Sequence, residues 1–282
     1  MKLKYPVAIA CFFLSLLVLT IWSSPAKTRE LTQLAPVLGC VEQPSASSSK
    51  PAALSSIPIA LDRFRKPSPP LTEEASGTTK ANPYTPREVI TLAAASNYGD
   101  RYFRDVAGNP VSQEPIIVLH ETVAPANSVI NYFQAFQSDE SNQASYHTLI
   151  ATNGTVIYFV PPDKRAFGAG NSVFKSASGD ESVRTNSQYP SSVNNFAYHI
   201  SLETPSDGMN NGYSHSGYTE AQYRSLAWLV AKTDVPLERI TTHRIVDRSG
   251  SRIDPRSFNF KIFQERLSEY PRNKEIFIGC YP

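Results

Sequence analysis

The sequence lacks a strong excess of either charge, and it lacks any internal repeat. Its 27 basic and 25 acidic side chains leave a net charge of +2, and the basic residues are scattered along the chain. A nucleic-acid-binding domain usually concentrates basic residues on one face, so we predict no nucleic-acid partner. Without repeats, 282 residues allow one large folded domain or two small ones.

The sequence also lacks an apolar run long enough to cross a membrane comfortably. The longest run, from Val7 to Trp22, has 16 residues, whereas a spanning helix needs about 20. Lys2 and Lys4 precede this run and Ser-Ser-Pro-Ala follows it, which is the pattern of an export signal. We therefore assign residues 1–25 to a cleaved signal peptide or to a retained membrane anchor. Both assignments predict an exported protein of the periplasm or cell envelope, and the anchor would tether it to the membrane.

Cysteine is scarce, with three residues in the whole chain. Cys11 lies inside the predicted signal, which leaves Cys40 and Cys280 near the two ends of the exported chain. In an oxidising compartment such a pair forms a disulfide or remains as two free thiols. Separation along the sequence does not decide between these two states.

Proline and serine, in contrast, are abundant before residue 86. Stretches such as "EQPSASSSKPAA" and "KPSPPLTEEASGTTKANP" cannot bury enough apolar surface to offset the entropy of ordering. We predict a flexible linker over residues 26–85, in which Ser56 to Phe64 could dock as a short segment. The folded domain is predicted to span residues 86–282.

Within this domain, helical and strand patterns alternate. The turn at Asn153-Gly154 predicts a β-hairpin, and Thr219 with Gln222 forms a capping box before an apolar stripe. Strands separated by helices indicate an α/β fold with a central mixed β-sheet flanked by helices. The predicted helices are 86–96, 127–137, 218–234 and 258–269, and the predicted strands are 116–120, the two arms of the hairpin, 196–203 and 239–244.

Three side chains with metal-binding chemistry end or follow predicted strands. They are His120 in "IIVLHET", His243 in "ITTHRIV" and Asp254 in "SRIDPRSF". Three protein ligands with an open fourth position are typical of catalytic zinc, whereas a structural zinc is usually closed by four ligands. A single histidine is more often an ordinary core or surface residue, so spacing alone supports this site only weakly.

Several separated motifs strengthen the interpretation because they occur in the order of a known family. "IIVLHET", "SYHTLIATNGTVIYFVPPDKRAFGAGNS", "NNFAYHISLET" and "THR…RSGSRIDP" resemble the zinc-dependent N-acetylmuramoyl-L-alanine amidases. That family includes phage-lysozyme-type amidases and peptidoglycan recognition proteins, and the resemblance covers about residues 100–265. It implies the fold named above, with His120, His243 and Asp254 as ligands of Zn²⁺. It also implies a metal-activated water that attacks the amide between N-acetylmuramic acid and L-alanine.

The resemblance transfers less simply to the residues that would handle protons. Tyr146 matches the family's tyrosine, Arg252 stands where the family has lysine, and Ser201 occupies the family's glutamate position. Side chains alternate along a strand, so Glu203 shares a face with Ser201 at a distance of about 6.6 Å. We take Tyr146, Glu203 and Arg252 as the catalytic candidates, with a surface carboxylate as the alternative for Glu203. An arginine cannot shuttle protons near neutral pH but can stabilise an oxyanion.

Three further residues are candidates for substrate binding, namely Asn171, Ser172 and His199. His147 is expected to be structural, because it alternates with Tyr146 along one strand. The expected partner is peptidoglycan or its muropeptide fragments, and the protein is expected to be a monomer. A non-catalytic peptidoglycan-binding module of the same fold is the competing hypothesis. The presence of all three ligands favours the enzyme.

Overall fold

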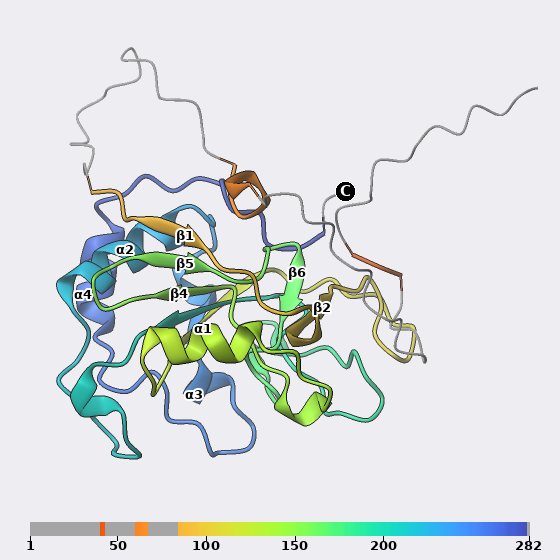
Figure 1. Ribbon diagram of the computed structural model, residues 1–282. Helices are drawn as coiled ribbons and strands as arrows, with labels where there is room; N and C mark the ends of the chain where they lie inside the picture. Colours follow the sequence, from red (N-terminus) through yellow and green to blue (C-terminus); the bar gives the residue numbers. More distant parts are fainter. Residues whose placement is uncertain (1–39, 43–59, 67–83, 281–282) are drawn as a thin grey trace, which may run out of the picture. The chain divides into compact units, whose positions relative to one another are not determined.

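The computed structural model describes residues 40–42, 60–66 and 84–280 (Figure 1). The predicted signal or anchor and most of the predicted linker lie outside these ranges. Within them, none of the helices combines the length and the apolar character that crossing a bilayer requires.

A six-stranded mixed sheet forms the centre of the described domain. Its strand order is β1-β5-β4-β9-β3-β10. Only β4 and β5 pair in antiparallel fashion, as the arms of the predicted hairpin, and the other neighbours are parallel. The strands are β1 Glu88–Ile90, β2 Tyr98–Asp100, β3 Ile116–Glu121, β4 Thr148–Ile150, β5 Val156–Tyr158, β6 Lys164–Ala166, β7 Phe174–Ser176, β8 Gly179–Glu181, β9 Ala197–Leu202 and β10 Ile240–Thr242.

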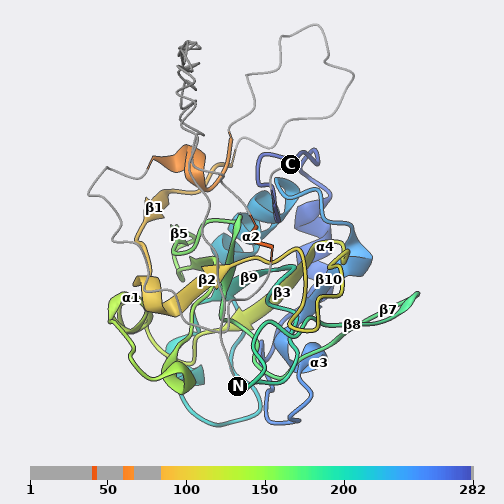
Figure 2. The same cartoon turned by 90° about the vertical axis from the view of Figure 1, so that its right-hand side faces the viewer.

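Helices cover both faces of this sheet, which confirms the predicted fold class. They are α1 Ala126–Gln134, α2 Glu220–Ala231, α3 His243–Val246 and α4 Phe260–Leu267. In Figure 1, α1 lies in front of the sheet, and α2 and α4 lie at its far side. Viewed from the side, β3, β9 and β10 run next to one another, and the β7–β8 hairpin projects from the body (Figure 2).

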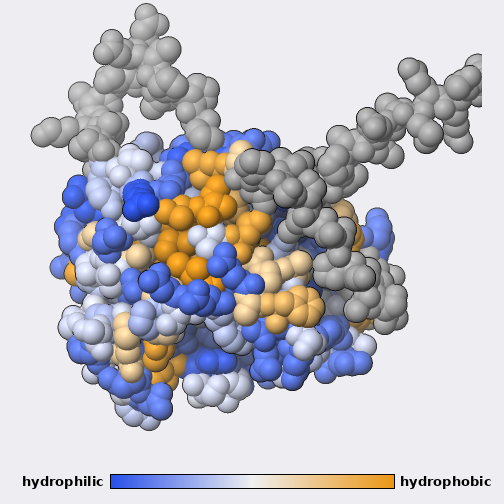
Figure 3. Space-filling model, in the orientation of Figure 1, coloured by the Kyte–Doolittle hydropathy of each residue, from blue (hydrophilic) through white to orange (hydrophobic). Residues whose placement is uncertain are grey.

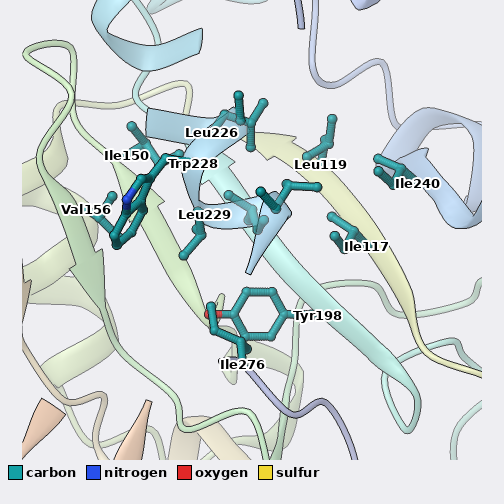
Figure 4. Close-up of a cluster of buried hydrophobic side chains, with 14 of the residues drawn as sticks. Ile117, Leu119, Ile150, Val156, Tyr198, Leu226, Trp228, Leu229, Ile240 and Ile276 are labelled. Carbon is teal, nitrogen blue, oxygen red and sulfur yellow. The ribbon is translucent and has the colours of Figure 1, made fainter. Parts of the chain in front are cut away.

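The central strands are apolar because each of their faces meets a different part of the core. All residues of β3 and β9 are buried. Side chains alternate across a strand, so Leu119 and Tyr198 pack against α2 in one cluster, together with Leu226 and Trp228 (Figure 4). Val118 packs in a separate cluster with Val246. His120 shares a face of β3 with Val118, so its side chain lies on the face of the sheet opposite α2 and α4.

Local sequence signals account for the best-predicted elements. Thr219 and Gln222 form the capping box that begins α2. At the hairpin turn, Gly154 has a φ of +85°, and a Cβ there would come within 2.8 Å of the Tyr84 hydroxyl and 2.9 Å of the Ser225 hydroxyl. Glycine is therefore required at this turn both by its backbone conformation and by close packing.

The predicted helix over residues 86–96 is wrong. This stretch contains strand β1 and a 3-10 turn at Ala95–Asn97. The chain lies along the edge of the sheet, where β1 pairs with β5 and the Thr91 amide donates to the Tyr158 carbonyl at 2.8 Å. These sheet hydrogen bonds outweigh the weak local helix propensity. Apolar residues gather over β1 and β5 in the view of Figure 3.

Part of the predicted linker is docked on the domain. Phe64 is 1% exposed, and its ring centroid lies 5.0 Å from that of Tyr158. Arg65 forms ion pairs with Glu88 at 2.6 Å and Glu275 at 2.9 Å. Residues 60–66 are therefore part of the folded domain, as the sequence "SIPIALDRF" suggested.

A disulfide joins Cys40 to Cys280, the pairing that the sequence left undecided. Next to it, the Val41 amide donates to the Arg101 carbonyl at 2.9 Å, and the Phe103 amide donates to the Val41 carbonyl at 3.0 Å. The segment around Cys40 is thus attached to the domain by one covalent bond and by a short backbone bridge.

Candidate metal centre

The three predicted ligands meet at one edge of the sheet. His120 is the fifth residue of β3, and His243 follows β10 as the first residue of α3. Strands β3 and β10 are parallel neighbours with Thr242 opposite Leu119, so His120 and His243 emerge side by side. Asp254 approaches from the loop before α4. One ligand atom from each of the three residues lies within 4.8 Å of the others.

The distances show that one nitrogen of each imidazole faces the carboxylate. His120 Nδ1 lies 3.4 Å from Asp254 Oδ2, and His243 Nδ1 lies 3.1 Å from Asp254 Oδ1. The two imidazole rings have centroids 4.6 Å apart. His120 Nδ1 is buried and has no hydrogen-bond partner within the described part of the chain. A buried nitrogen without a partner is costly, and a cation at this point would satisfy it.

The protonation states also suit a metal. Burial lowers the pKa of His120 to about 4, although the Asp254 carboxylate acts in the opposite direction. Burial alone would raise the pKa of Asp254, but its contacts with the His120 and His243 imidazoles hold that pKa below its ordinary value. Near neutral pH the site thus offers a neutral His120 imidazole and an ionised carboxylate. Nitrogen and oxygen donors of this kind fit Zn²⁺.

Tyr146 lies beside the ligands. Its ring centroid is 4.6 Å from that of His120 and 5.3 Å from that of Phe133. Burial and the negative charge of Asp254 raise the pKa of Tyr146. Its hydroxyl therefore keeps its proton near neutral pH and can donate a hydrogen bond.

Ser201 and Arg252 occupy different surroundings near the same centre. Ser201 is opposite His120 in the β3–β9 register, and its hydroxyl is buried without a partner in the described ranges. Arg252 is exposed, and its positive charge is close enough to lower the pKa of His120 further, beyond the effect of burial. One serine hydroxyl and one guanidinium thus stand where the family resemblance led us to look for glutamate and lysine.

Glu203 is engaged in the fold. Its Oε1 accepts a hydrogen bond from the Ala126 amide at the start of α1, and its Oε2 accepts one from the Thr152 amide, both at 2.8 Å. These bonds fix the entry to α1 against the hairpin. Its observed contacts are structural, and the catalytic assignment of Glu203 stays an untested prediction.

The three predicted substrate-binding residues lie in different surroundings. Asn171 is exposed and, together with Arg165 and Phe167, lines a cavity of about 300 Å³. Ser172 is buried, and its hydroxyl accepts from the Val193 amide at 3.0 Å. His199 is 0% exposed and lies behind His120. Ser172 and His199 are thus buried in this structure, and the substrate-binding assignments of all three residues stay predictions.

His147 is fully buried, as expected of a structural residue. Its ring stacks on Tyr198 with centroids 4.6 Å apart. Burial and the positive charge of Arg101 hold the pKa of His147 well below its usual range. A neutral His147 is compatible with the buried guanidinium beside it.

The sequence interpretation missed a buried ionic network next to the ligands. Glu121 follows His120 and points to the opposite face of β3. It forms an ion pair with Arg256 at 2.6 Å and accepts hydrogen bonds from the hydroxyls of Tyr218 and Thr204, both at 3.3 Å. His215 Nε2 also lies 3.1 Å from its carboxylate. A charged residue at the end of an apolar strand is the signal that could have revealed this network.

Arg256 extends the network into the neighbouring loop. Its guanidinium donates to the backbone carbonyls of Gly208, Asn210 and Gly212. Because Arg256 stands two residues after Asp254, the network connects the segment of the third ligand to the strand of the first.

Comparison with known proteins identifies the family. The family described as N-acetylmuramoyl-L-alanine amidase matches residues 110–257, which is more than half of the chain and includes His120, His243 and Asp254. The chain belongs to this family. This result confirms the resemblance drawn from the sequence motifs, and it places the chain among proteins that cleave or bind peptidoglycan.

Solved structures of similar proteins share low sequence identity with this amidase-family chain. A selenomethionine derivative of AmpD is 22% identical, with 65% of this chain and 96% of that chain covered and a TM-score of 0.45. LysC from Clostridium intestinale is 18% identical, with 65% and 99% covered and a TM-score of 0.38. The Drosophila peptidoglycan recognition protein SD is 15% identical, with 64% and 95% covered and a TM-score of 0.36. The comparison with curated proteins found no match.

Proposed function

We propose that this protein is an exported zinc-dependent amidase that hydrolyses the amide between N-acetylmuramic acid and L-alanine in peptidoglycan. The observation that carries the proposal is the convergence of His120, His243 and Asp254, whose ligand atoms lie within 4.8 Å of one another. Membership in the amidase family supports the substrate class.

The three residues would hold Zn²⁺ through two imidazole nitrogens and one carboxylate. When bound, zinc supplies a Lewis acid that polarises a carbonyl and lowers the pKa of water. His120 and His243 turn the same nitrogen, Nδ1, toward the carboxylate of Asp254. Three protein donors leave a position open for substrate or water, as in catalytic zinc sites.

The surrounding residues can stabilise the negative charge that develops when a carbonyl is attacked. Tyr146 remains protonated, because burial and the charge of Asp254 raise its pKa. It can therefore donate a hydrogen bond to an oxyanion near the ligands. The exposed guanidinium of Arg252 adds a permanent positive charge that does not transfer protons.

Two features support an exported location. The N-terminal sequence combines Lys2 and Lys4 with the apolar run from Val7 to Trp22. The Cys40–Cys280 disulfide fits an oxidising compartment, since cytosolic thiols are kept reduced. We propose the periplasm or cell envelope, with the N-terminal segment as a cleaved signal or a membrane tether.

One observation favours the second candidate, a peptidoglycan-binding module without activity. Ser201 stands at the family's glutamate position, and the nearby Glu203 uses both carboxylate oxygens to bind backbone amides. Neither of these two positions therefore offers a free carboxylate that could accept a proton from water.

A digestion assay distinguishes the two candidates. Purified protein lacking residues 1–25 is incubated with peptidoglycan sacculi, with and without a chelator, and new L-alanine amino termini are quantified. The amidase releases them only without chelator, and the Asp254→Ala variant releases none. The matched control Asp139→Ala, which changes an exposed carboxylate on the surface, keeps full activity. Binding to sacculi without release would replace the amidase with the binding module.

A further inference from the structure

A second histidine lies directly behind the first metal ligand. His199 Nδ1 is 2.9 Å from His120 Nε2, within hydrogen-bonding distance. The two residues come from neighbouring parallel strands, β9 and β3, and both are 0% exposed. His199 is therefore in contact with a proposed ligand while being shielded from solvent and substrate.

The direction of this hydrogen bond would follow from a cation bound at His120 Nδ1. A neutral imidazole carries one proton, on one of its two nitrogens. His120 turns Nδ1 toward Asp254, and a nitrogen that binds a cation must be free of its proton. With a cation on Nδ1, the proton of His120 would sit on Nε2 and be donated to His199 Nδ1. An acceptor at this place would favour the tautomer in which His120 Nδ1 can bind a metal.

His199 is itself held in place by His147, the residue just before β4. The backbone amide of His199 donates to His147 Nδ1 at 2.9 Å. His147 Nε2 therefore carries the proton and donates to the Lys164 carbonyl at 3.1 Å. The rings of His147 and His199 are almost parallel, at 11°, with centroids 5.8 Å apart. These contacts with His147 thus hold His199 in position next to His120.

Gly168 supplies the space that the His199 ring occupies. A Cβ at residue 168 would lie 2.5 Å from Cγ and 2.6 Å from Nδ1 of His199. These ring atoms are close to the backbone of a central strand, so they cannot move away as the end of a flexible side chain could. Any larger residue at 168 would displace the nitrogen that accepts from His120.

We propose that His199 is a positioning residue for the metal ligand His120, and that Gly168 is the glycine that makes this arrangement possible. The proposal rests on metal binding by His120, His243 and Asp254, as proposed above. Hydrogen-bond partners of this kind orient a ligating histidine and fix its tautomer, and their loss typically weakens metal binding about 10- to 100-fold.

The test compares two variants of similar shape. In His199→Asn, the side-chain oxygen can occupy the place of Nδ1 and accept from His120, whereas His199→Leu has no acceptor. Zinc affinity is measured by competition with a chromophoric chelator, and the melting temperature is measured with and without zinc. We expect His199→Asn to bind zinc nearly as tightly as the original protein. We expect His199→Leu to bind it about 10- to 100-fold more weakly, with a smaller increase in melting temperature on adding zinc.

A second variant pair keeps the test decisive if His199→Leu does not fold. Gly168→Ala should weaken zinc binding by a similar factor, because it moves the His199 ring. In a His199→Ala background the same glycine substitution should have no further effect, since the ring is gone. Unchanged zinc affinity in His199→Leu or Gly168→Ala would overturn the proposal. If the unaltered protein bound no zinc, both this proposal and the zinc-dependent function would be contradicted. That outcome differs from a failure of the His199 proposal alone, in which the unaltered protein binds zinc and the variants bind it equally well.

Discussion

Replacing Glu121 with glutamine tests whether the buried network beside the metal ligands holds this part of the fold together. Glu121 and Arg256 form an ion pair at 2.6 Å, with side chains that are 0% and 2% exposed. Glutamine is nearly the same size but carries no charge. The substitution therefore leaves the Arg256 guanidinium buried without its counter-charge.

The expected loss of stability is large. Removing one partner of a buried ion pair costs about 3–5 kcal/mol, because the remaining charge is uncompensated. For a domain of about 200 residues, each kcal/mol corresponds to about 2–4 °C in melting temperature. We therefore expect Glu121→Gln to lower the melting temperature by about 6–20 °C.

The assay is thermal and urea-induced unfolding of metal-free protein, followed by circular dichroism. Glu220→Gln is the matched control, because Glu220 pairs with Arg266 at 2.6 Å but the two side chains are 54% and 33% exposed. We expect this control to lose about 1 kcal/mol or less. If Glu121→Gln lost no more than the control, the network would not be what anchors the Asp254 segment to β3.

Three further predictions address the site and its surroundings. Tyr146→Phe should lower kcat about 100-fold, the usual cost of losing one oxyanion donor, and should leave zinc content unchanged; an unaltered kcat would remove Tyr146 from the mechanism. Glu203→Gln should lower the free energy of unfolding by about 1–2 kcal/mol, since it weakens one of two amide contacts. If Glu203 is also the base, kcat should fall while zinc content is unchanged, and an unaltered kcat would remove Glu203 from the mechanism. Metal-free protein should lose stability as the pH falls from about 6.5 to about 4, because unfolded His120 takes up a proton near pH 6.5 while the folded residue has a pKa of about 4. The contribution of His120 is on the order of 3 kcal/mol, and a urea midpoint that stayed constant over this pH range would contradict it.

The sequence predicted the elements whose signals are local. The capping box at Thr219 and the glycine turn at Gly154 lie within a few residues of the structure they determine. The stretch 86–96 was predicted incorrectly because its conformation depends on β5, about 70 residues away. Docking of Phe64 on Tyr158 is also a long-range contact, which composition could suggest but not locate.

The residues of the candidate site also differ in how well the sequence predicted them. Their places at or after strands singled out His120, His243 and Asp254 as a weakly supported metal site, and the family resemblance strengthened that assignment. The neighbours of these ligands could not be predicted, because the partners of Glu121 and His199 come from distant segments. Alternation along a strand predicts the face on which His199 lies but not that its side chain is fully buried.

The zinc content of the purified protein tests the central claim most directly. Protein lacking residues 1–25 is loaded with zinc, freed of excess metal by gel filtration, and analysed by elemental mass spectrometry alongside His120→Ala. We predict one zinc ion per chain in the unaltered protein and almost none in the variant. Equal zinc content in the two proteins, or no zinc in either, would contradict the assignment of His120, His243 and Asp254 as a metal centre.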